Sequence, residues 1–312
     1  MGTGNCRTAF TQTLLELARQ DATVYALASD SRGSVTLGDY VKELPGQFVE
    51  IGIAEQDEVG VAAGLAAMGK KPYVCAPACF LSARSLEQIK VDVAYSHQNV
   101  KIVGVSGGIS YGALGYSHHS THDIAVMRAI TGIEVYLPCD AAQTRAMFRA
   151  LAGRETPAYI RMGRGDVPDV YGEDAPFEPG RANRLKEGND LTIIACGEMV
   201  ARALEAAVLL ELGGIHARVL DMHTLKPLDT GAVLEAAAET KRVVTMEEHN
   251  LHGGLGGAVA ETLCGAHPVP VLILALPDEE LEPGSSGAVL AHYELDAQGA
   301  AKRIAAWLKD TQ

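Results

Sequence analysis

The chain has 312 residues and a net charge of −13, and 47% of its residues are hydrophobic while 21% are charged. This balance is typical of a globular protein with a sizeable core, and the length predicts about two domains. The acidic charge argues against nucleic acid or an anionic membrane as a partner, because both bind basic surfaces.

Nothing in the sequence indicates secretion or a membrane span. The first residues do not resemble a signal peptide, and no run reaches the roughly 18 apolar residues of a membrane helix. The six cysteines are scattered without a CxxC pair, and we expect the nearest two, Cys75 and Cys79, to form neither a metal site nor a disulfide. We therefore expect a cytoplasmic protein with reduced thiols.

In the first half of the chain, short β-branched runs alternate with stretches of helical periodicity. Strands are predicted at 23–29, 47–53, 71–77, 100–106, 133–138 and 157–163, and helices at 7–20, 55–69, 84–96 and 140–153. The strands are apolar almost throughout, which indicates a mostly parallel sheet with helices on both faces.

Composition changes over residues 166–188, where prolines, glycines and mixed charges predict a linker or a long surface segment. The α/β rhythm then resumes with strands predicted at 190–196, 216–222, 242–247 and 270–276. We predict an α/β protein of two three-layer domains with mostly parallel sheets. The first domain covers 1–170, the linker 171–188 and the second domain 189–312.

Glu55 stands out because it directly follows the apolar run IGIA at the start of a predicted helix. An acid in the first helical turn interacts favourably with the helix dipole, and this explanation is sufficient for Asp57 and Glu58. Glu55, however, is predicted to lie at the carboxyl end of a central strand, where open α/β sheets bind ligands. A carboxyl group in such apolar surroundings is suited to share a proton with a ligand nitrogen.

A series of motifs follows Glu55 in a specific order. GIAEQ (52–56) precedes AAGLAAMGKKPYV (62–74) and EQIKVDVAY (87–95), and these are followed by a glycine- and histidine-rich stretch (99–130), VYLPCD (135–140) and PAYIRMGRG (157–165). The series resembles the thiamine-diphosphate enzymes of the transketolase family. The resemblance is to their pyrimidine-binding domain and transketolase C-terminal domain, and it covers essentially the whole chain.

The resemblance implies cofactor contacts for three residues. Glu55 is expected to be catalytic and to contact N1′ of the aminopyrimidine ring of thiamine diphosphate, which serves as the electron sink. Phe80 is expected to stack on that ring, although an ordinary core aromatic is the alternative. Asp30 resembles the aspartate after the first strand that helps to hold the cofactor and the subunit contact.

The same resemblance assigns His118, in SHHSTHD (117–123), to catalysis and to substrate oxygens near the reacting carbon. A neutral imidazole there donates or accepts hydrogen bonds as an alkoxide forms and collapses. Ordinary polar loop histidines are the alternative, and His119 is the candidate to substitute for its neighbour. We expect no metal site on this chain, because neither carboxylate nor cysteine stands at ligand spacing around the histidines.

Substrate anions are assigned to arginines, since the planar guanidinium group matches phosphate geometry. By resemblance, Arg7 and Arg161 are expected to bind the substrate phosphate, and Ser34 is expected to lie in the same pocket. Arg164 is expected to be the surface residue of the pair in YIRMGRG.

Two positions depart from the family pattern. Ser106 stands where many transketolases have a histidine, and Leu114 stands where they have an aspartate that reads a substrate hydroxyl. We therefore expect the sugar to be an unusual ketose phosphate or another anionic ketose.

The sequence also lacks the GDG…N signature with which the family holds the diphosphate and Mg²⁺. We expect a second, N-terminal transketolase subunit to carry that signature together with Mg²⁺ or Ca²⁺. This chain would then be the C-terminal subunit of a split transketolase of pentose phosphate metabolism, and homodimerisation would produce a heterotetramer. It would transfer a two-carbon ketol unit from a ketose phosphate to an aldose phosphate.

Three alternatives remain open. The first is a β-type subunit of a 2-oxoacid dehydrogenase E1, the second is half of a 1-deoxyxylulose-5-phosphate synthase, and the third is a non-catalytic module of the same fold. A nucleotide site at the glycine-rich stretch 247–261 is not expected, because no other pyrophosphate-binding feature accompanies it.

Overall fold

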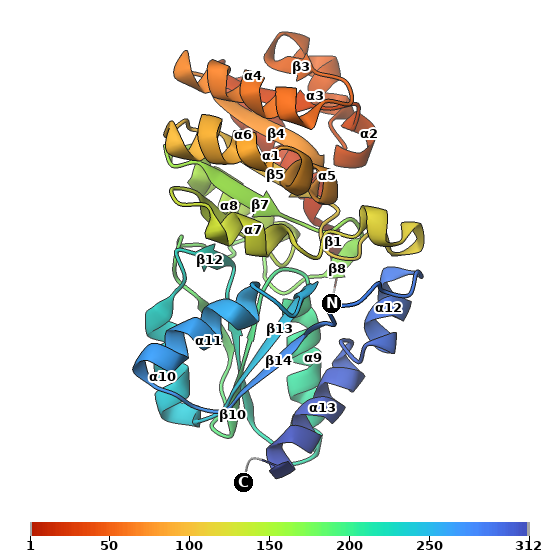
Figure 1. The fold of residues 1–312 in the computed structure, drawn as a ribbon, viewed down its shortest axis with the longest axis vertical. Helices are drawn as coiled ribbons and strands as arrows, with labels where there is room; N and C mark the ends of the chain where they lie inside the picture. Colours follow the sequence, from red (N-terminus) through yellow and green to blue (C-terminus); the bar gives the residue numbers. More distant parts are fainter. Residues whose placement is uncertain (1, 311–312) are drawn as a thin grey trace.

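Seven strands form the larger sheet of the computed structural model, which describes residues 2–310 (Figure 1). Their order is β12-β6-β7-β5-β4-β2-β3, and neighbours are parallel except for the antiparallel pair β12–β6. The strands are β2 (Val24–Ala28), β3 (Phe48–Glu50), β4 (Lys71–Pro77), β5 (Lys101–Val105), β6 (Glu134–Tyr136), β7 (Ala158–Arg161) and β12 (Thr224–Lys226).

Helices cover both faces of this sheet, as the apolar strands predicted. The first face packs against α1 (Cys6–Gln20) and α8 (Ala141–Ala152), and the second against α4 (Glu55–Ala67), α5 (Ala78–Arg84), α7 (Asp123–Ala129) and the π-helical η2 (Ile89–Tyr95). Alternate strand residues serve the two cores: Val74 faces α4, whereas Tyr73 and Cys75 face α1 and α8. Three shorter helices also belong to this half: α2 (Arg32–Val35), α3 (Gly38–Glu43) and α6 (Leu86–Gln88).

The second half of the chain builds a five-stranded sheet in the order β14-β13-β10-β11-β9, seen in the lower part of Figure 1. Its strands are β9 (Asn183–Lys186), β10 (Leu191–Ala195), β11 (Ala217–Asp221), β13 (Val243–Asn250) and β14 (Val271–Leu276). The core on one face includes residues of α9 (Met199–Leu212) and α13 (Ala297–Asp310), and the core on the other includes residues of α10 (Thr230–Thr240) and α11 (Leu255–Ala266). The helix α12 (Ser286–His292) precedes α13.

The two halves share structure that the composition did not predict. Part of the segment predicted as linker is β9, an antiparallel edge strand on β11. Its outward side chains Arg184 and Lys186 form ion pairs with Glu235 and Glu211, so a polar sequence is compatible with an edge strand. In addition, β12 crosses from the second half to the first sheet. Within the first half, β8 (Asp166–Pro168) pairs with β1 (Thr3–Asn5).

Candidate active site

A pocket of about 350 Å³ opens at the carboxyl ends of β2, β4 and β5. Parallel strands bring these ends to one edge of the sheet, where α/β proteins bind ligands. Five residues predicted from the sequence meet here: Asp30, Ser34, Glu55, Phe80 and His118. The rest of the wall consists of Ser29, Ser31, Ile53, Pro77, Arg84, Tyr111 and Leu114.

Glu55 is the first residue of α4 and is only 2% exposed. Its Oε2 accepts a hydrogen bond of 2.6 Å from Nη1 of Arg84. The guanidinium carbon of Arg84 also lies 5.0 Å from the ring centre of Phe80. Sequence reasoning did not select Arg84; the available signal was its position one helical turn after Phe80.

Aromatic rings also line the pocket. The His118 ring stands edge-on to Phe80 and Tyr111, with centroid distances of 5.3 and 5.7 Å. Its Nδ1 lies 2.9 Å from Oγ of Ser117. His118 ends η4 (Tyr116–His118), which follows η3 (Gly112–Leu114) in the loop after β5.

The wall chemistry fits one end of thiamine diphosphate. A buried carboxylate beside an aromatic face suits a flat heteroaromatic ring with a protonatable nitrogen. Of the described residues that line the pocket, only Arg84 carries a fixed positive charge, and Glu55 already pairs with it. A diphosphate group therefore finds no unpaired fixed cation on this wall.

The structure places Arg161 away from the pocket, in contrast to the sequence expectation. It ends β7 and is 6% exposed, with Nε 3.5 Å from Asp123 and Nη2 3.8 Å from Glu248. Nη2 also donates a hydrogen bond of 2.8 Å to the carbonyl oxygen of Glu248 in β13. Although burial opposes the charged form, Asp123 and Glu248 raise the pKa of Arg161. Arg161 therefore links the two halves of the chain and does not line the pocket.

Arg7 holds two backbone segments together. Its guanidinium group donates 2.6 Å hydrogen bonds to the carbonyl oxygens of Ser34 and Arg164. Arg164 is half-buried at the rim, not a fully exposed surface residue, and its Nη1 donates a hydrogen bond of 2.8 Å to the Tyr111 hydroxyl group. Of the two arginines in YIRMGRG, Arg164 is thus the one that contacts a residue of the pocket wall, whereas sequence reasoning favoured Arg161.

Of four further residues that the sequence singled out, three are buried and one is exposed. Glu58, expected on a solvated helix start, is fully buried and accepts a hydrogen bond of 3.1 Å from the backbone N–H of Cys75. His119 is 3% exposed and lies 3.2 Å from the carbonyl oxygen of Gly112, so it does not replace His118 at the pocket. Ser106 is buried, whereas Leu114 is 56% exposed on the pocket wall.

The glycine-rich stretch after β13 is filled by the protein itself. Glu247 accepts hydrogen bonds of 2.6 and 2.7 Å from the backbone N–H groups of Leu255 and Gly256 at the start of α11. A Cβ atom on Gly254 would meet Glu247 at 1.9 Å. The carboxylate occupies the place where a nucleotide phosphate would bind a helix N-terminus.

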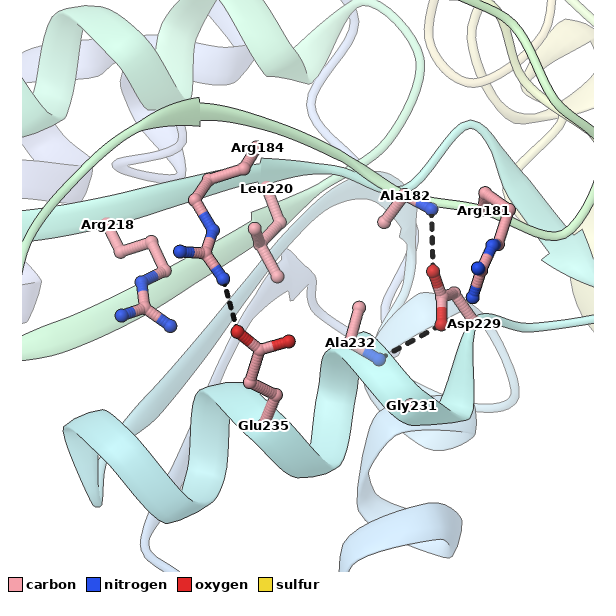
Figure 2. A pocket seen from close by; sticks show the side chains of 9 residues that line it. All are labelled: Arg181, Ala182, Arg184, Arg218, Leu220, Asp229, Gly231, Ala232 and Glu235. Carbon is pink, nitrogen blue, oxygen red and sulfur yellow. Dashed lines mark hydrogen bonds and ion pairs between the residues drawn. The ribbon is translucent and has the colours of Figure 1, made fainter.

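A second pocket, of about 470 Å³, lies between β9, β11 and α10 (Figure 2). Two of its three arginines have acidic partners: Arg184 pairs with Glu235, and Arg218 pairs with Glu239. Asp229 caps α10 by accepting a hydrogen bond of 3.0 Å from the N–H of Ala232. We assign no ligand to this pocket.

Within residues 2–310, no three histidine, cysteine, aspartate or glutamate side chains are grouped so that they could hold a metal ion. No helix in this part of the chain has both the length and the apolar character required to cross a membrane.

Comparison with known proteins defines the family. Residues 3–169 match the model of the transketolase pyrimidine-binding domain, and residues 180–299 match that of the transketolase C-terminal domain. The chain therefore belongs to the transketolase family, which implies dependence on thiamine diphosphate. The family predicted from the ordered motifs is confirmed.

Subunits of split transketolases are among the relatives. The chain is 57% identical to one of the subunits of the apulose-4-phosphate transketolase of Phocaeicola vulgatus, covering 97% of each chain. It is 42% identical to a 6-deoxy-6-sulfo-D-fructose transketolase subunit of Clostridium sp. strain MSTE9, covering 94% of this chain and 91% of the relative. A solved structure described as a split gene transketolase, inactive beta4 tetramer, superposes with a TM-score of 0.90 at 42% identity, covering 99% of this chain and all of that one. This chain is thus similar in extent to the separately encoded subunits.

Proposed function

We propose that this chain is one subunit of a two-chain, thiamine-diphosphate-dependent transketolase that moves a two-carbon ketol unit from a phosphorylated ketose to an aldose or aldose phosphate. The observation that carries the proposal is the meeting of Glu55, Phe80 and His118 at one pocket. When bound, thiamine diphosphate supplies the electron sink for cleaving a carbon–carbon bond beside a ketone.

Each residue has a role in this proposal. Glu55 holds the protonatable ring nitrogen, and Phe80 provides an apolar face for the ring. His118 exchanges a hydrogen bond with the substrate oxygen whose charge changes during the reaction, and Asp30 and Ser34 complete the wall. Arg164, held by Tyr111, binds the substrate phosphate at the rim.

The rest of the cofactor requires a second chain. Because the pocket wall has no free fixed cation, we propose that an N-terminal subunit with a GDG…N signature holds the diphosphate and Mg²⁺. Exposed apolar side chains at Ile53, Met68 and Tyr95, which are 75%, 80% and 79% exposed, support further subunit contacts. Homodimerisation of this chain within a heterotetramer is consistent with them, and light scattering on the reconstituted complex tests that stoichiometry.

The substrate is proposed to be an unusual ketose phosphate. Leu114 offers no hydrogen bond on the pocket wall, and the relative at 57% identity is named for apulose 4-phosphate. Apulose 4-phosphate is therefore the first candidate donor.

The test reconstitutes this chain with its diphosphate-binding partner and supplies thiamine diphosphate and Mg²⁺. Apulose 4-phosphate, xylulose 5-phosphate and 6-deoxy-6-sulfo-D-fructose are compared as donors, with the Glu55→Gln complex as the inactive control. Turnover highest with apulose 4-phosphate supports the proposal. Equal or better turnover of xylulose 5-phosphate contradicts the altered specificity. In a separate assay with pyruvate as donor and glyceraldehyde 3-phosphate as acceptor, formation of 1-deoxyxylulose 5-phosphate with release of CO₂ supports the synthase alternative.

A further inference from the structure

Arg84 makes two contacts inside the pocket at once. Its Nη1 donates a hydrogen bond of 2.6 Å to Glu55, and its guanidinium carbon lies 5.0 Å from the ring centre of Phe80. Phe80 and Arg84 are one turn apart in α5, and Glu55 begins the adjacent helix α4. The side chain therefore bridges the aromatic face and the buried acid.

The two side chains of this ion pair differ in their solvent exposure. The Glu55 side chain is 3% exposed, whereas the Arg84 side chain is 45% exposed. An ionised carboxylate at such a depth is unfavourable without a counter-charge. Arg84 supplies that charge from a partly exposed position at the end of α5, and a long arginine side chain of this kind can keep its charged group in water.

A guanidinium group is a planar cation that stacks on aromatic rings and donates hydrogen bonds to carboxylates. These are the two interactions that the proposed function requires of the aminopyrimidine ring with Phe80 and Glu55. We propose that Arg84 occupies the ring position of the pocket while the cofactor is absent, and that it turns out toward solvent when thiamine diphosphate binds. This inference rests on the proposed function. It adds that the Arg84 side chain competes with the aminopyrimidine ring for the same site.

This competition has a consequence for assembly. Cofactor binding to this chain must replace an existing ion pair and a stacking contact, so the net gain from the ring alone is small. The additional interactions at the diphosphate end are then needed for tight binding. Arg84 thereby makes loading of the cofactor depend on the partner subunit.

The test measures thiamine diphosphate binding by isothermal titration calorimetry on the cofactor-free two-chain complex, with Mg²⁺ present. Arg84→Met removes the charge and the planar group but keeps an unbranched apolar side chain. We expect the variant to bind thiamine diphosphate about fivefold tighter or more, because the competing ion pair is lost. Arg149→Met is the matched control, because Arg149 forms a surface ion pair with Glu16. The Arg149→Met complex is expected to bind thiamine diphosphate with the same affinity as the wild-type complex.

A second variant guards against a folding failure. Arg84→Lys retains the charge and is expected to show an intermediate affinity, because an ammonium group pairs with Glu55 but stacks poorly. Unchanged or weaker binding by both Arg84 variants overturns the inference, since it means that Arg84 stays in place and supports the cofactor. The proposed function is judged separately: it fails if the folded wild-type complex does not bind thiamine diphosphate or if Glu55→Gln leaves its affinity unchanged.

Discussion

The guanidinium group of Arg164 lies 4.8 Å from the ring centre of Tyr111 and donates a hydrogen bond of 2.8 Å to its hydroxyl group. Tyr111 lines the candidate active site, so the pair holds a positive charge at the rim. Arg161, three residues earlier in the chain, is instead enclosed between Asp123 and Glu248. Arg164 and Arg161 thus have different environments. We therefore expect substitution of Arg164 to affect substrate binding and substitution of Arg161 to affect stability.

Arg164→Gln is expected to raise the KM for a phosphorylated donor by about tenfold or more, because a charge-assisted hydrogen bond contributes about 1.5–3 kcal/mol. The KM for the unphosphorylated form of the same sugar should stay near the wild-type value. Steady-state kinetics of the reconstituted complex with both donors provides the measurement. An equal rise for both sugars would show that Arg164 does not read the phosphate.

Arg161→Gln is expected to lower the free energy of unfolding by about 3–5 kcal/mol, because it leaves Asp123 and Glu248 buried without their counter-charge. Arg149→Gln, which breaks an exposed pair with Glu16, should change it by at most about 1 kcal/mol. Urea denaturation of the wild type, Arg161→Gln and Arg149→Gln measures these changes in the free energy of unfolding. Similar small changes in both variants would contradict the structural role of Arg161.

His118→Asn is expected to lower kcat by about 10²–10⁴-fold, the usual contribution of a positioned acid or base. Thiamine diphosphate affinity should be unchanged, because His118 contacts Phe80 and Tyr111 edge-on and leaves Glu55 untouched. Kinetics and calorimetry on one preparation separate the two effects. A loss of cofactor affinity that accounts for the lower rate would remove His118 from the catalytic residues.

Leu114→Asp tests how the pocket selects its sugar. The new carboxylate accepts a hydrogen bond from a substrate hydroxyl, which contributes about 1.5–3 kcal/mol with a charged acceptor. The ratio of kcat/KM for xylulose 5-phosphate to that for apulose 4-phosphate is therefore expected to rise by about tenfold. Because Leu114 is 56% exposed, the variant should fold normally. Leu114→Asn provides an uncharged control, and an unchanged ratio in both variants would rule out this position as a specificity determinant.

Glu58 predicts a pH dependence of stability. Burial raises the pKa of its carboxyl group from 4.5 to about 7. Between these values the folded state keeps a proton that the unfolded chain loses, so the free energy of unfolding falls as pH rises. The loss amounts to about 3 kcal/mol for this group, and the contribution is constant below and above the interval.

Glu58→Gln removes that ionisation while keeping an oxygen to accept the hydrogen bond from Cys75. The stability of the wild type relative to the variant should therefore decline between about pH 4.5 and pH 7. Urea denaturation at several pH values measures this difference, in which other titrating groups cancel. Parallel stability curves for the two proteins would contradict the raised pKa.

Much of the fold followed from the sequence because its signals are local. Strand β4 was predicted at 71–77 and observed at Lys71–Pro77, since a continuous apolar run marks a strand covered on both faces. The edge strand β9 was missed because its polar residues Arg184 and Lys186 have no apolar period; they form a strand only because β11 offers an unpaired edge. The predicted helix over 84–96 became α6 and the π-helical η2, a change of winding that periodicity does not reveal.

The sequence by itself determined the family, the two α/β units and the approach of Glu55, Phe80 and His118, because the carboxyl ends of parallel strands meet at one edge. Only the tertiary structure decided which charges are enclosed. Arg161 is paired inside and Arg164 reaches the rim, while Arg84 pairs with Glu55 beside Phe80. Ion pairing and burial depend on side chains that are distant in the sequence, so they cannot be read from a motif.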